Sequence, residues 1–281
     1  MRPLPAQAPT SEPPLGASKR RWLSQPFFSL IGGHWREVCR LVIMELLVGA
    51  ALIAFFAVLE NVVNRDPLVR IDQTIFHVLQ SLRTGPFDRV MVAITELGDW
   101  VVTTAVTMVA LFWFIWHRNR RTALYLCAVV LGPSILSFLM KLTLRVARPI
   151  DLYSGWDSYS FPSGHVAVNA ALYGFVTVLI AREETSWRRL GAIAFTATVV
   201  LFLAFSRLYL GAHFLSDVLA GLSFSTAWVA LMSAGYLHGK SRAVGTTGLT
   251  RAIALTIILV GGVYVYHRYP LDMQRYVYRD R

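Results

Sequence analysis

The sequence predicts an all-α fold, a polytopic bundle of membrane-spanning helices, and three observations lead to this prediction. Of the 281 residues, 55% are hydrophobic and only 15% are charged, which is too apolar for an ordinary soluble domain. The apolar residues gather into runs that approach or reach the roughly 20 residues needed to cross a bilayer. Short basic clusters stand at the ends of these runs, as they do beside membrane surfaces. We therefore expect six core transmembrane helices and treat a seventh apolar run near the C-terminus as a candidate for another.

The first forty residues precede the apolar runs. Residues 1–21 are rich in Pro and Ala and end in a Lys-Arg-Arg cluster, which is typical of a disordered tail, here placed in the cytoplasm. Residues 22–40 mix aromatic side chains with polar ones. This mixture predicts a segment that lies in the membrane interface.

A membrane-embedded domain is expected over residues 41–240, with its first span at 41–59. Residues 61–100 are more polar, and apolar side chains recur there at helical spacing, beginning at Ile71. We interpret 61–100 as an amphipathic segment on the outer surface.

Five more apolar runs complete the predicted core, and a C-terminal extension follows them. The five runs are residues 101–116, 122–140, 166–181, 190–205 and 214–237. The extension, 241–281, contains the seventh run at 252–266. That run either crosses the membrane or folds back along its interface.

The chain has a formal net charge of +11, and the positions of the basic residues indicate the partner. They are scattered at the ends of apolar runs and form no single patch, which favours anionic lipids over nucleic acid. With the N-terminus in the cytoplasm, more than half of the 27 Lys and Arg residues lie on the cytoplasmic side. The positive-inside rule therefore favours this orientation.

One polar stretch, residues 206–217, stands between two apolar runs and contains Arg207, His213 and Asp217. Charged groups in such a place are costly unless they are paired or face water. His213 and Asp217 are four residues apart, so on a helix the carboxylate can bind one imidazole nitrogen and leave the other free. The stretch is either a catalytic pair or a satisfied polar patch at a helix end.

Two further polar segments border apolar runs. Lys141 and Arg148 are seven residues apart, which on a helix brings both cations to one face and favours an anion; the alternative is an anchor for lipid headgroups. Ser163, Gly164 and His165 directly precede the run at 166–181. Backbone N–H groups at a helix start also favour an anion, although a serine cap beside an incidental histidine would look the same.

The expected topology places all three segments on one side of the membrane. Cations, backbone donors and histidines without a cage of carboxylates predict a phosphate site that needs no metal and no cofactor. The chain lacks a Walker loop and a Gly-x-Ser-x-Gly elbow, which excludes two common rivals. The candidate residues are Lys141, Arg148, Ser163, Gly164, His165, Arg207, His213 and Asp217.

In these motifs the chain resembles the type 2 phosphatidic acid phosphatase superfamily, over about residues 70–237. The family signature has three parts: Lys, six residues, Arg-Pro; then Pro-Ser-Gly-His; then Ser-Arg, five residues, His, three residues, Asp. All three parts are present without a departure, beginning at Lys141, Pro162 and Ser206. Three parts in this order make a specific match, whereas each part alone is a weak one.

The resemblance implies a role for each candidate residue. His213 would be the nucleophile that forms a phosphohistidine, and Asp217 would orient it. His165 would protonate the leaving oxygen and later activate water. The phosphate oxygens would be bound by the remaining residues, namely Lys141, Arg148, Arg207, Ser163 and Gly164.

The implied activity is hydrolysis of a lipid phosphate or diphosphate, with undecaprenyl diphosphate as the first choice. Phosphatidylglycerophosphate, phosphatidate and lipid A phosphates are close alternatives. The expected location is a bacterial inner membrane, with the site facing the periplasm. A phosphotransferase would use the same residues, and a lipid-binding or transport protein is a non-enzymatic alternative. The spans disfavour the soluble haloperoxidases of the same superfamily.

Overall fold

The computed structural model describes residues 27–65, 67–239 and 242–276, and the chain divides into two compact units, residues 1–43 and 44–281. In the first unit the described residues belong to helix α1 (Phe27–Asn64). The predicted tail and residues 22–26 of the predicted interfacial segment lie outside the described residues. The second unit contains the other helices and all the candidate residues.

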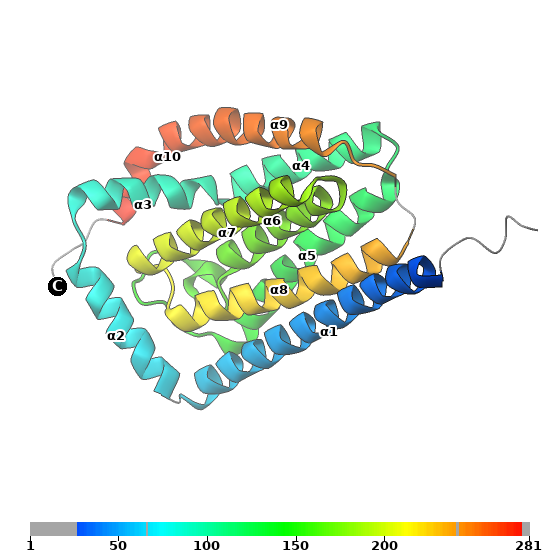
Figure 1. The fold of residues 1–281 in the computed structure, drawn as a ribbon. Coiled ribbons are helices and arrows are strands. Elements are labelled where there is room, and N and C mark those ends of the chain that lie inside the picture. Colours follow the sequence, from blue (N-terminus) through cyan, green and yellow to red (C-terminus); the bar gives the residue numbers. More distant parts are fainter. Residues whose placement is uncertain (1–26, 66, 240–241, 277–281) are drawn as a thin grey trace, which may run out of the picture. The chain divides into compact units, whose positions relative to one another are not determined.

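The described residues are almost entirely helical, which confirms the all-α prediction (Figure 1). After α1 come α2 (Pro67–Ser81), α3 (Gly85–Leu97), α4 (Trp100–Trp116), α5 (Arg120–Leu144), α6 (Gly164–Glu183), α7 (Ser186–Tyr209), α8 (Leu215–His238), α9 (Thr246–Thr256) and α10 (Gly262–Arg275). A 3-10 turn, Gly155–Ser158, lies in the loop between α5 and α6. A π-helical turn, Ile257–Gly261, joins α9 to α10.

Within the described residues, seven helical segments are long and apolar enough to cross a membrane. They include the six predicted core spans, and the protein is an integral membrane protein. The seventh segment, Thr246–Arg275, is α9 and α10 taken together. The sequence left open whether this run crosses or folds back, and its length and composition suit crossing.

The predicted outer segment, residues 61–100, contains two helices, α2 and α3. By length and composition, α3 and α4 together also make one candidate span, Gly85–Trp116. Asp99 caps α4 by accepting a hydrogen bond from the N–H of Val101 (3.1 Å). A polar cap therefore stands inside this candidate span, between α3 and α4.

The core is organised around α6, which packs against α5, α7 and α8 (Figure 1). Leu172, Phe175 and Leu179 of α6 are fully buried. Gly221 of α8 lets that helix approach closely, because a Cβ there would lie 2.9 Å from the carbonyl oxygen of Ser163. The close packing of α6 and α8 sets the relative positions of the two histidine-bearing segments.

The outward faces of the helices are apolar, as expected of a protein whose solvent is lipid. Phe195 of α7 and Ile53 of α1 are more than two-thirds exposed. Trp100, Trp116 and Trp187 are also strongly exposed and stand at helix ends. Tryptophans at such positions are typical of the two membrane interfaces.

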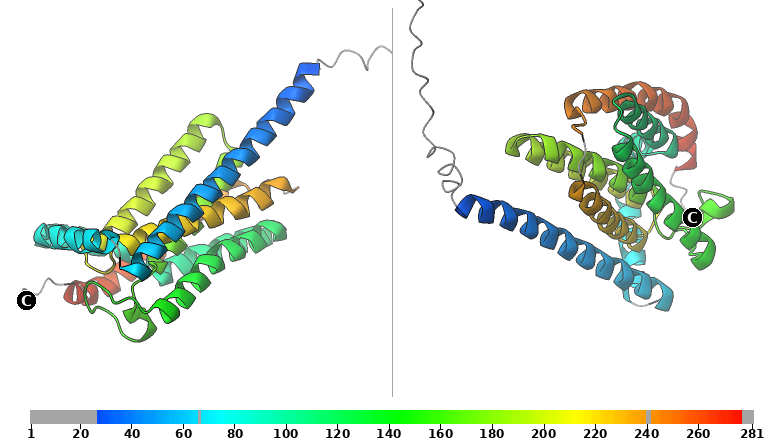
Figure 2. Two further views of the ribbon diagram at one scale, coloured as in Figure 1. Left: turned by 90° about the horizontal axis from the view of Figure 1, so that it is seen from below. Right: turned by 90° about the vertical axis from the view of Figure 1, so that its right-hand side faces the viewer.

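The C-terminal helices pack on α3 and α4. Figures 1 and 2 show α9 and α10 beside α4 and α3, and the packing pairs α9 with α4 and α10 with α3. Asp272 of α10 is buried and forms ion pairs with Arg268 (3.5 Å) and Arg275 (3.0 Å). Both ion pairs lie within α10 and hold the buried carboxylate near the C-terminal end of this helix.

Candidate active site

A tight turn between α7 and α8 presents His213. The N–H groups of Ala212 and His213 both donate to the carbonyl oxygen of Arg207 (3.0 and 3.3 Å). Gly211 adopts φ +69°, and a Cβ there would lie 2.7 Å from a methyl group of Ile150. Glycine is therefore required on both steric and conformational grounds, and the turn places the His213 side chain in the interior.

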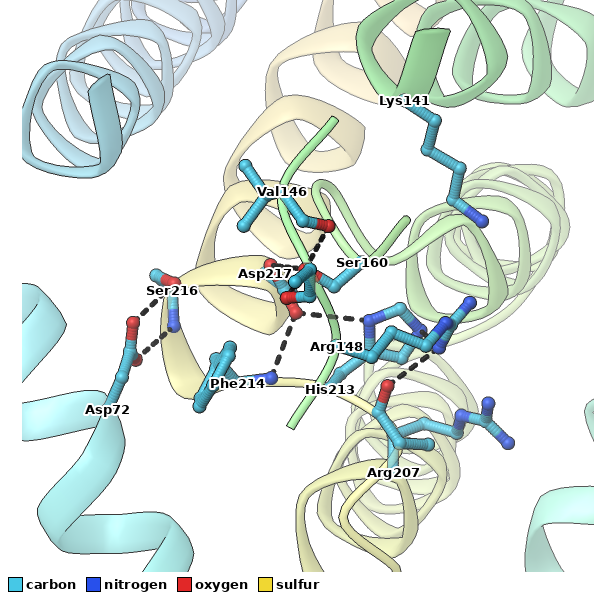
Figure 3. A network of polar contacts seen from close by, with 12 residues as sticks. Asp72, Lys141, Val146, Arg148, Ser160, Arg207, His213, Phe214, Ser216 and Asp217 are labelled. Atoms are coloured by element: carbon cyan, nitrogen blue, oxygen red, sulfur yellow. Dashed lines mark hydrogen bonds and ion pairs between the residues drawn. The ribbon is translucent and has the colours of Figure 1, made fainter. Parts of the chain in front are cut away.

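The Asp217 carboxylate holds the His213 ring from the first turn of α8 (Figure 3). Oδ2 lies 3.2 Å from His213 Nδ1 and accepts the N–H of Phe214 (2.9 Å). Oδ1 accepts the hydroxyl of Ser160 (3.2 Å). A carboxylate only accepts hydrogen bonds, so this contact favours the tautomer with its proton on Nδ1 and the lone pair on Nε2.

Arg148 stands on the other side of the imidazole. Its Nη1 lies 3.2 Å from His213 Nε2 and donates to the carbonyl oxygen of Ala212 (2.6 Å). Its Nε donates to the carbonyl oxygen of Asp157 (2.7 Å). The guanidinium therefore lies beside the imidazole nitrogen that Asp217 leaves unprotonated.

The electrostatic surroundings keep the His213 ring neutral. Burial lowers the pKa of His213 well below its usual range, and the nearby positive charges of Arg148, Arg207 and Lys141 lower it further. A neutral imidazole retains its lone pair on Nε2 at neutral pH. His213 can therefore act as a nucleophile or a base without first losing a proton.

Ser163 and His165 stand at the start of α6, close to the α8 segment. The N–H of Ser163 donates to the carbonyl oxygen of Asp217 (3.0 Å), which ties the two segments together. His165 hydrogen-bonds the main chain of Thr95. Ser163 Oγ and His165 Nε2 are buried and have no hydrogen-bond partner among the described residues. Buried polar atoms are nearly always satisfied, so these two are available to a bound polar group.

Space for His165 depends on Gly98, between α3 and α4. A Cβ at Gly98 would lie 2.6 Å from His165 Nε2 and 2.7 Å from Leu203 Cδ2. Both distances are shorter than real Cβ contacts allow. Gly98 is thus part of the site by virtue of having no side chain.

The Arg207 guanidinium is buried and largely engaged. Its Nη1 donates to Thr95 Oγ1 (2.8 Å) and to the hydroxyl of Tyr276 (3.0 Å). Its Nη2 donates to the hydroxyl of Tyr153 (2.9 Å). Nε has no partner among the described residues. An engaged guanidinium with one edge left over can still bind an oxyanion.

The eight predicted residues occupy the same end of the second unit, at the C-terminal ends of α5 and α7 and the starts of α6 and α8. Direct contacts join Arg148, His213 and Asp217, and main-chain contacts link Ser163 to Asp217 and Arg207 to His213. Gly164 is the first residue of α6. Lys141 is instead paired with Asp157, Nζ to Oδ1 at 2.9 Å.

Several contributing residues were missed by the sequence reading. Ser160 directly precedes the Phe-Pro-Ser-Gly-His motif, and its polarity was the only available signal. Asp72 of α2 is buried and accepts both the N–H (2.8 Å) and the hydroxyl (2.6 Å) of Ser216, which holds the first turn of α8. Burial raises the pKa of Asp72, against the effect of these hydrogen bonds. No local pattern indicates Asp72, Asp157 or Tyr276, because each reaches the site through tertiary packing.

An open cavity of about 440 Å³ adjoins the site. Its lining residues are Asp151, Leu152, Tyr153, Ser154, Asp157 and Arg275. Tyr153 and Asp157 also contact Arg207, Arg148 and Lys141, so the cavity leads to the cations of the site. Among the described residues no group of three or more His, Cys, Asp or Glu could hold a metal ion. A reaction that needs no metal ion stays a prediction.

Comparisons with known proteins agree on one family. Residues 122–239 match the PAP2 superfamily. The chain is 24% identical over 176 residues to phosphatidylglycerophosphatase B of Bacillus subtilis (strain 168), covering 62% of this chain and 87% of that protein. It is 32% identical over 121 residues to lipid A 1-phosphatase of Rhizobium johnstonii, covering 39% of this chain and 46% of that protein.

The fold of this chain resembles that of a solved structure. The crystal structure of a transmembrane PAP2-type phosphatidylglycerolphosphate phosphatase from Bacillus subtilis aligns with a TM-score of 0.58 at 24% identity. The alignment covers 70% of this chain and 97% of that one. The similarity therefore extends over nearly the whole of a smaller membrane protein and leaves part of this chain outside it.

Proposed function

We propose that this chain, which belongs to the PAP2 superfamily of membrane lipid phosphatases, hydrolyses a lipid phosphate through a phosphohistidine on His213. One observation carries the proposal. The His213 ring is held between the Asp217 carboxylate at Nδ1 and the Arg148 guanidinium at Nε2, in an interior lined with further cations. This arrangement suits a neutral nucleophile that attacks a negatively charged phosphorus centre.

The first step forms a bond between His213 Nε2 and the terminal phosphorus. It breaks the bond from that phosphorus to the ester oxygen of a lipid phosphate, or to the bridging oxygen of a diphosphate. Because Arg148 lies on Nε2 in the resting arrangement, its guanidinium turns to the phosphoryl oxygens as the substrate binds. Asp217 stabilises the positive charge that the imidazole gains. His165 donates a proton to the departing oxygen through Nε2, which has no partner among the described residues.

The second step releases the phosphate. His165, now neutral, takes a proton from water, the water oxygen bonds to phosphorus, and the bond to His213 Nε2 breaks. Ser163, Gly164, Lys141 and Arg207 bind the phosphoryl oxygens in both steps, as charge spreads over those oxygens in the transition state. The products are phosphate and the lipid with one phosphate fewer, which is an alcohol from a lipid phosphate and a lipid monophosphate from a lipid diphosphate.

The substrate class is a lipid phosphate or diphosphate that reaches the site from the membrane. We place the site on the outer, periplasmic face of a bacterial inner membrane, because the basic loops favour a cytoplasmic N-terminus. Undecaprenyl diphosphate is the first candidate and phosphatidylglycerophosphate the second. A panel that adds phosphatidate and lipid A, compared by rate in one detergent, identifies the preferred lipid; equal rates would mean that the site does not discriminate.

The test of the mechanism uses purified protein in detergent. We expect phosphate release in the presence of EDTA and inhibition by vanadate. His213→Ala should abolish release, whereas the exposed His77 offers a matched control in His77→Ala. Activity that survives in His213→Ala, or that EDTA removes, contradicts the proposal.

A second measurement separates the two histidines. With p-nitrophenyl phosphate the leaving group needs little help from an acid, so His165→Ala should still form the phosphoenzyme but hydrolyse it slowly. Acid-labile label from a labelled substrate should then accumulate on His165→Ala and be absent from His213→Ala. Equal labelling of the two variants would rule out these roles.

A further inference from the structure

The C-terminal end of the described chain reaches the site. Tyr276 directly follows α10 and is only 4% exposed. Its N–H donates to the carbonyl oxygen of Asp272 (2.9 Å), and its own carbonyl oxygen accepts a hydrogen bond from the Arg83 guanidinium. Its side chain belongs to a buried apolar cluster that includes Met91 and Tyr209. Tyr276 is therefore held at both its main chain and its side chain, although it lies outside the residues matched to the PAP2 superfamily.

The Tyr276 hydroxyl belongs to a triangle of contacts with Arg207 and Tyr153. Arg207 Nη1 donates to Tyr276 Oη (3.0 Å) and Nη2 donates to Tyr153 Oη (2.9 Å). The two tyrosine hydroxyls are 2.5 Å apart. A guanidinium fixed at both terminal nitrogens has little rotational freedom.

The N–H donors of the Arg207 guanidinium are only partly used, and those left over lie on one edge. A guanidinium has five N–H donors, two on each terminal nitrogen and one on Nε. Thr95 and Tyr276 accept both hydrogens of Nη1, and Tyr153 accepts one of Nη2. One Nη2 hydrogen and the Nε hydrogen are left, and buried Nε has no partner among the described residues. A pair of N–H groups from Nε and a terminal nitrogen is the geometry that binds a phosphate through two parallel hydrogen bonds.

We propose that Tyr276, with Tyr153, is a positioning residue that orients Arg207 so that its remaining N–H edge faces the phosphate. The proposal rests on the function proposed above, in which Arg207 binds phosphoryl oxygens. It gives the C-terminal helices a part in catalysis, because α10 leads directly to Tyr276, whose hydroxyl fixes one end of the guanidinium. Tyr276 touches the phosphate only through Arg207.

The test compares tyrosine-to-phenylalanine variants, which keep the ring and remove only the hydroxyl. Tyr276→Phe is the main variant and Tyr153→Phe is the second, since it removes the contact to the other terminal nitrogen. Tyr266→Phe is the control, because Tyr266 is 78% exposed on α10, the helix that Tyr276 follows. For each protein we would measure kcat, KM, the inhibition constant of vanadate and the thermal unfolding midpoint in detergent.

The expected result is a weaker phosphate clamp in a stable protein. Loss of one hydrogen bond to a charged group corresponds to about a tenfold effect, so Tyr276→Phe should raise the vanadate inhibition constant and lower kcat/KM by about that factor. Tyr153→Phe should act in the same direction. The unfolding midpoint should stay near that of Tyr266→Phe.

Three outcomes would overturn the proposal. Vanadate inhibition that matches Tyr266→Phe in both variants means that Arg207 needs no orientation by the hydroxyls. Lower activity with a lower unfolding midpoint and unchanged vanadate inhibition means that Tyr276 is only structural. Higher activity means that its hydroxyl competes with the phosphate.

A separate pair of variants distinguishes failure of the positioning role from failure of the proposed function. Arg207→Lys and His213→Ala should both lose activity if the proposed function is right. If they keep it, the proposed function fails and the role of Tyr276 fails with it. If they lose it while Tyr276→Phe behaves as the control, only the positioning role is refuted.

Discussion

Replacing Asp217 by asparagine removes the charge beside His213 and leaves the shape of the side chain. With its amide oxygen in the place of Oδ2, the new side chain would still accept from His213 Nδ1 and from the N–H of Phe214. Its amide nitrogen would then face the hydroxyl of Ser160. That hydroxyl can accept instead of donate, so the variant should remain folded with its polar contacts satisfied.

The size of the effect follows from the bonds that lose their charge. A hydrogen bond to a charged acceptor is about twice as strong as a neutral one, a difference on the order of 1 kcal/mol per bond. Two bonds to Oδ2 are affected, but only the bond to His213 strengthens as the imidazole takes the phosphoryl group. A loss of about 1–2 kcal/mol in the transition state should lower kcat roughly five- to thirtyfold. Asp217→Ala also removes the acceptor of the Phe214 N–H, so it should lose more activity and some stability.

The assay is the rate of phosphoenzyme formation, followed by rapid quench, with thermal unfolding measured on the same samples. Glu60→Gln, at an exposed position of α1, is a matched control that removes a carboxylate charge elsewhere. A rate in Asp217→Asn within about twofold of the unaltered protein would refute the reasoning. A rate as low as that of Asp217→Ala, with an equal loss of stability, would mean that the carboxylate serves the fold alone.

Two other predictions concern the histidines. Gly98→Ala should lower kcat by at least tenfold, because the added Cβ would lie 2.6 Å from His165 Nε2 and a displacement of about 1 Å in a catalytic group is costly. The control is Gly191→Ala, which has nothing within 4 Å of the added Cβ and should match the unaltered protein. Equal rates for the two variants would contradict the role of Gly98. Because burial, and then Arg148, lowers the pKa of His213, the nucleophile should stay unprotonated as pH falls through its ordinary value of about 6.5, so kcat/KM should decline only at lower pH. Arg148→Gln removes a positive charge, raises the pKa of His213 and should move this acidic limb to higher pH; an unmoved limb would show that the charge of Arg148 does not act on His213.

The fold was predictable from the sequence because lipid imposes a simple rule on composition. Each span needs about 20 apolar residues with its backbone bonded internally, and the predicted runs lie within the helices. Gly98 and Asp99 look like the end of a polar segment in the sequence, because two polar residues stand in the short connection between α3 and α4, although these helices together make one candidate span. Whether the run at 252–266 crosses depends on how α9 and α10 pack against α4 and α3, which composition does not encode.

Local sequence determined the spans, the turn chemistry of Gly211 and the three motifs that hold the candidate residues. These features depend on hydrophobic length, backbone conformation and short spacing, all of which are properties of neighbouring residues. Tertiary structure alone decided that Asp157 pairs with Lys141, that Asp72 holds the first turn of α8, and that Tyr276 reaches Arg207. Each of these contacts joins residues from different elements, so it exists only after the helices have packed and the cost of burying a charged group has selected its partner.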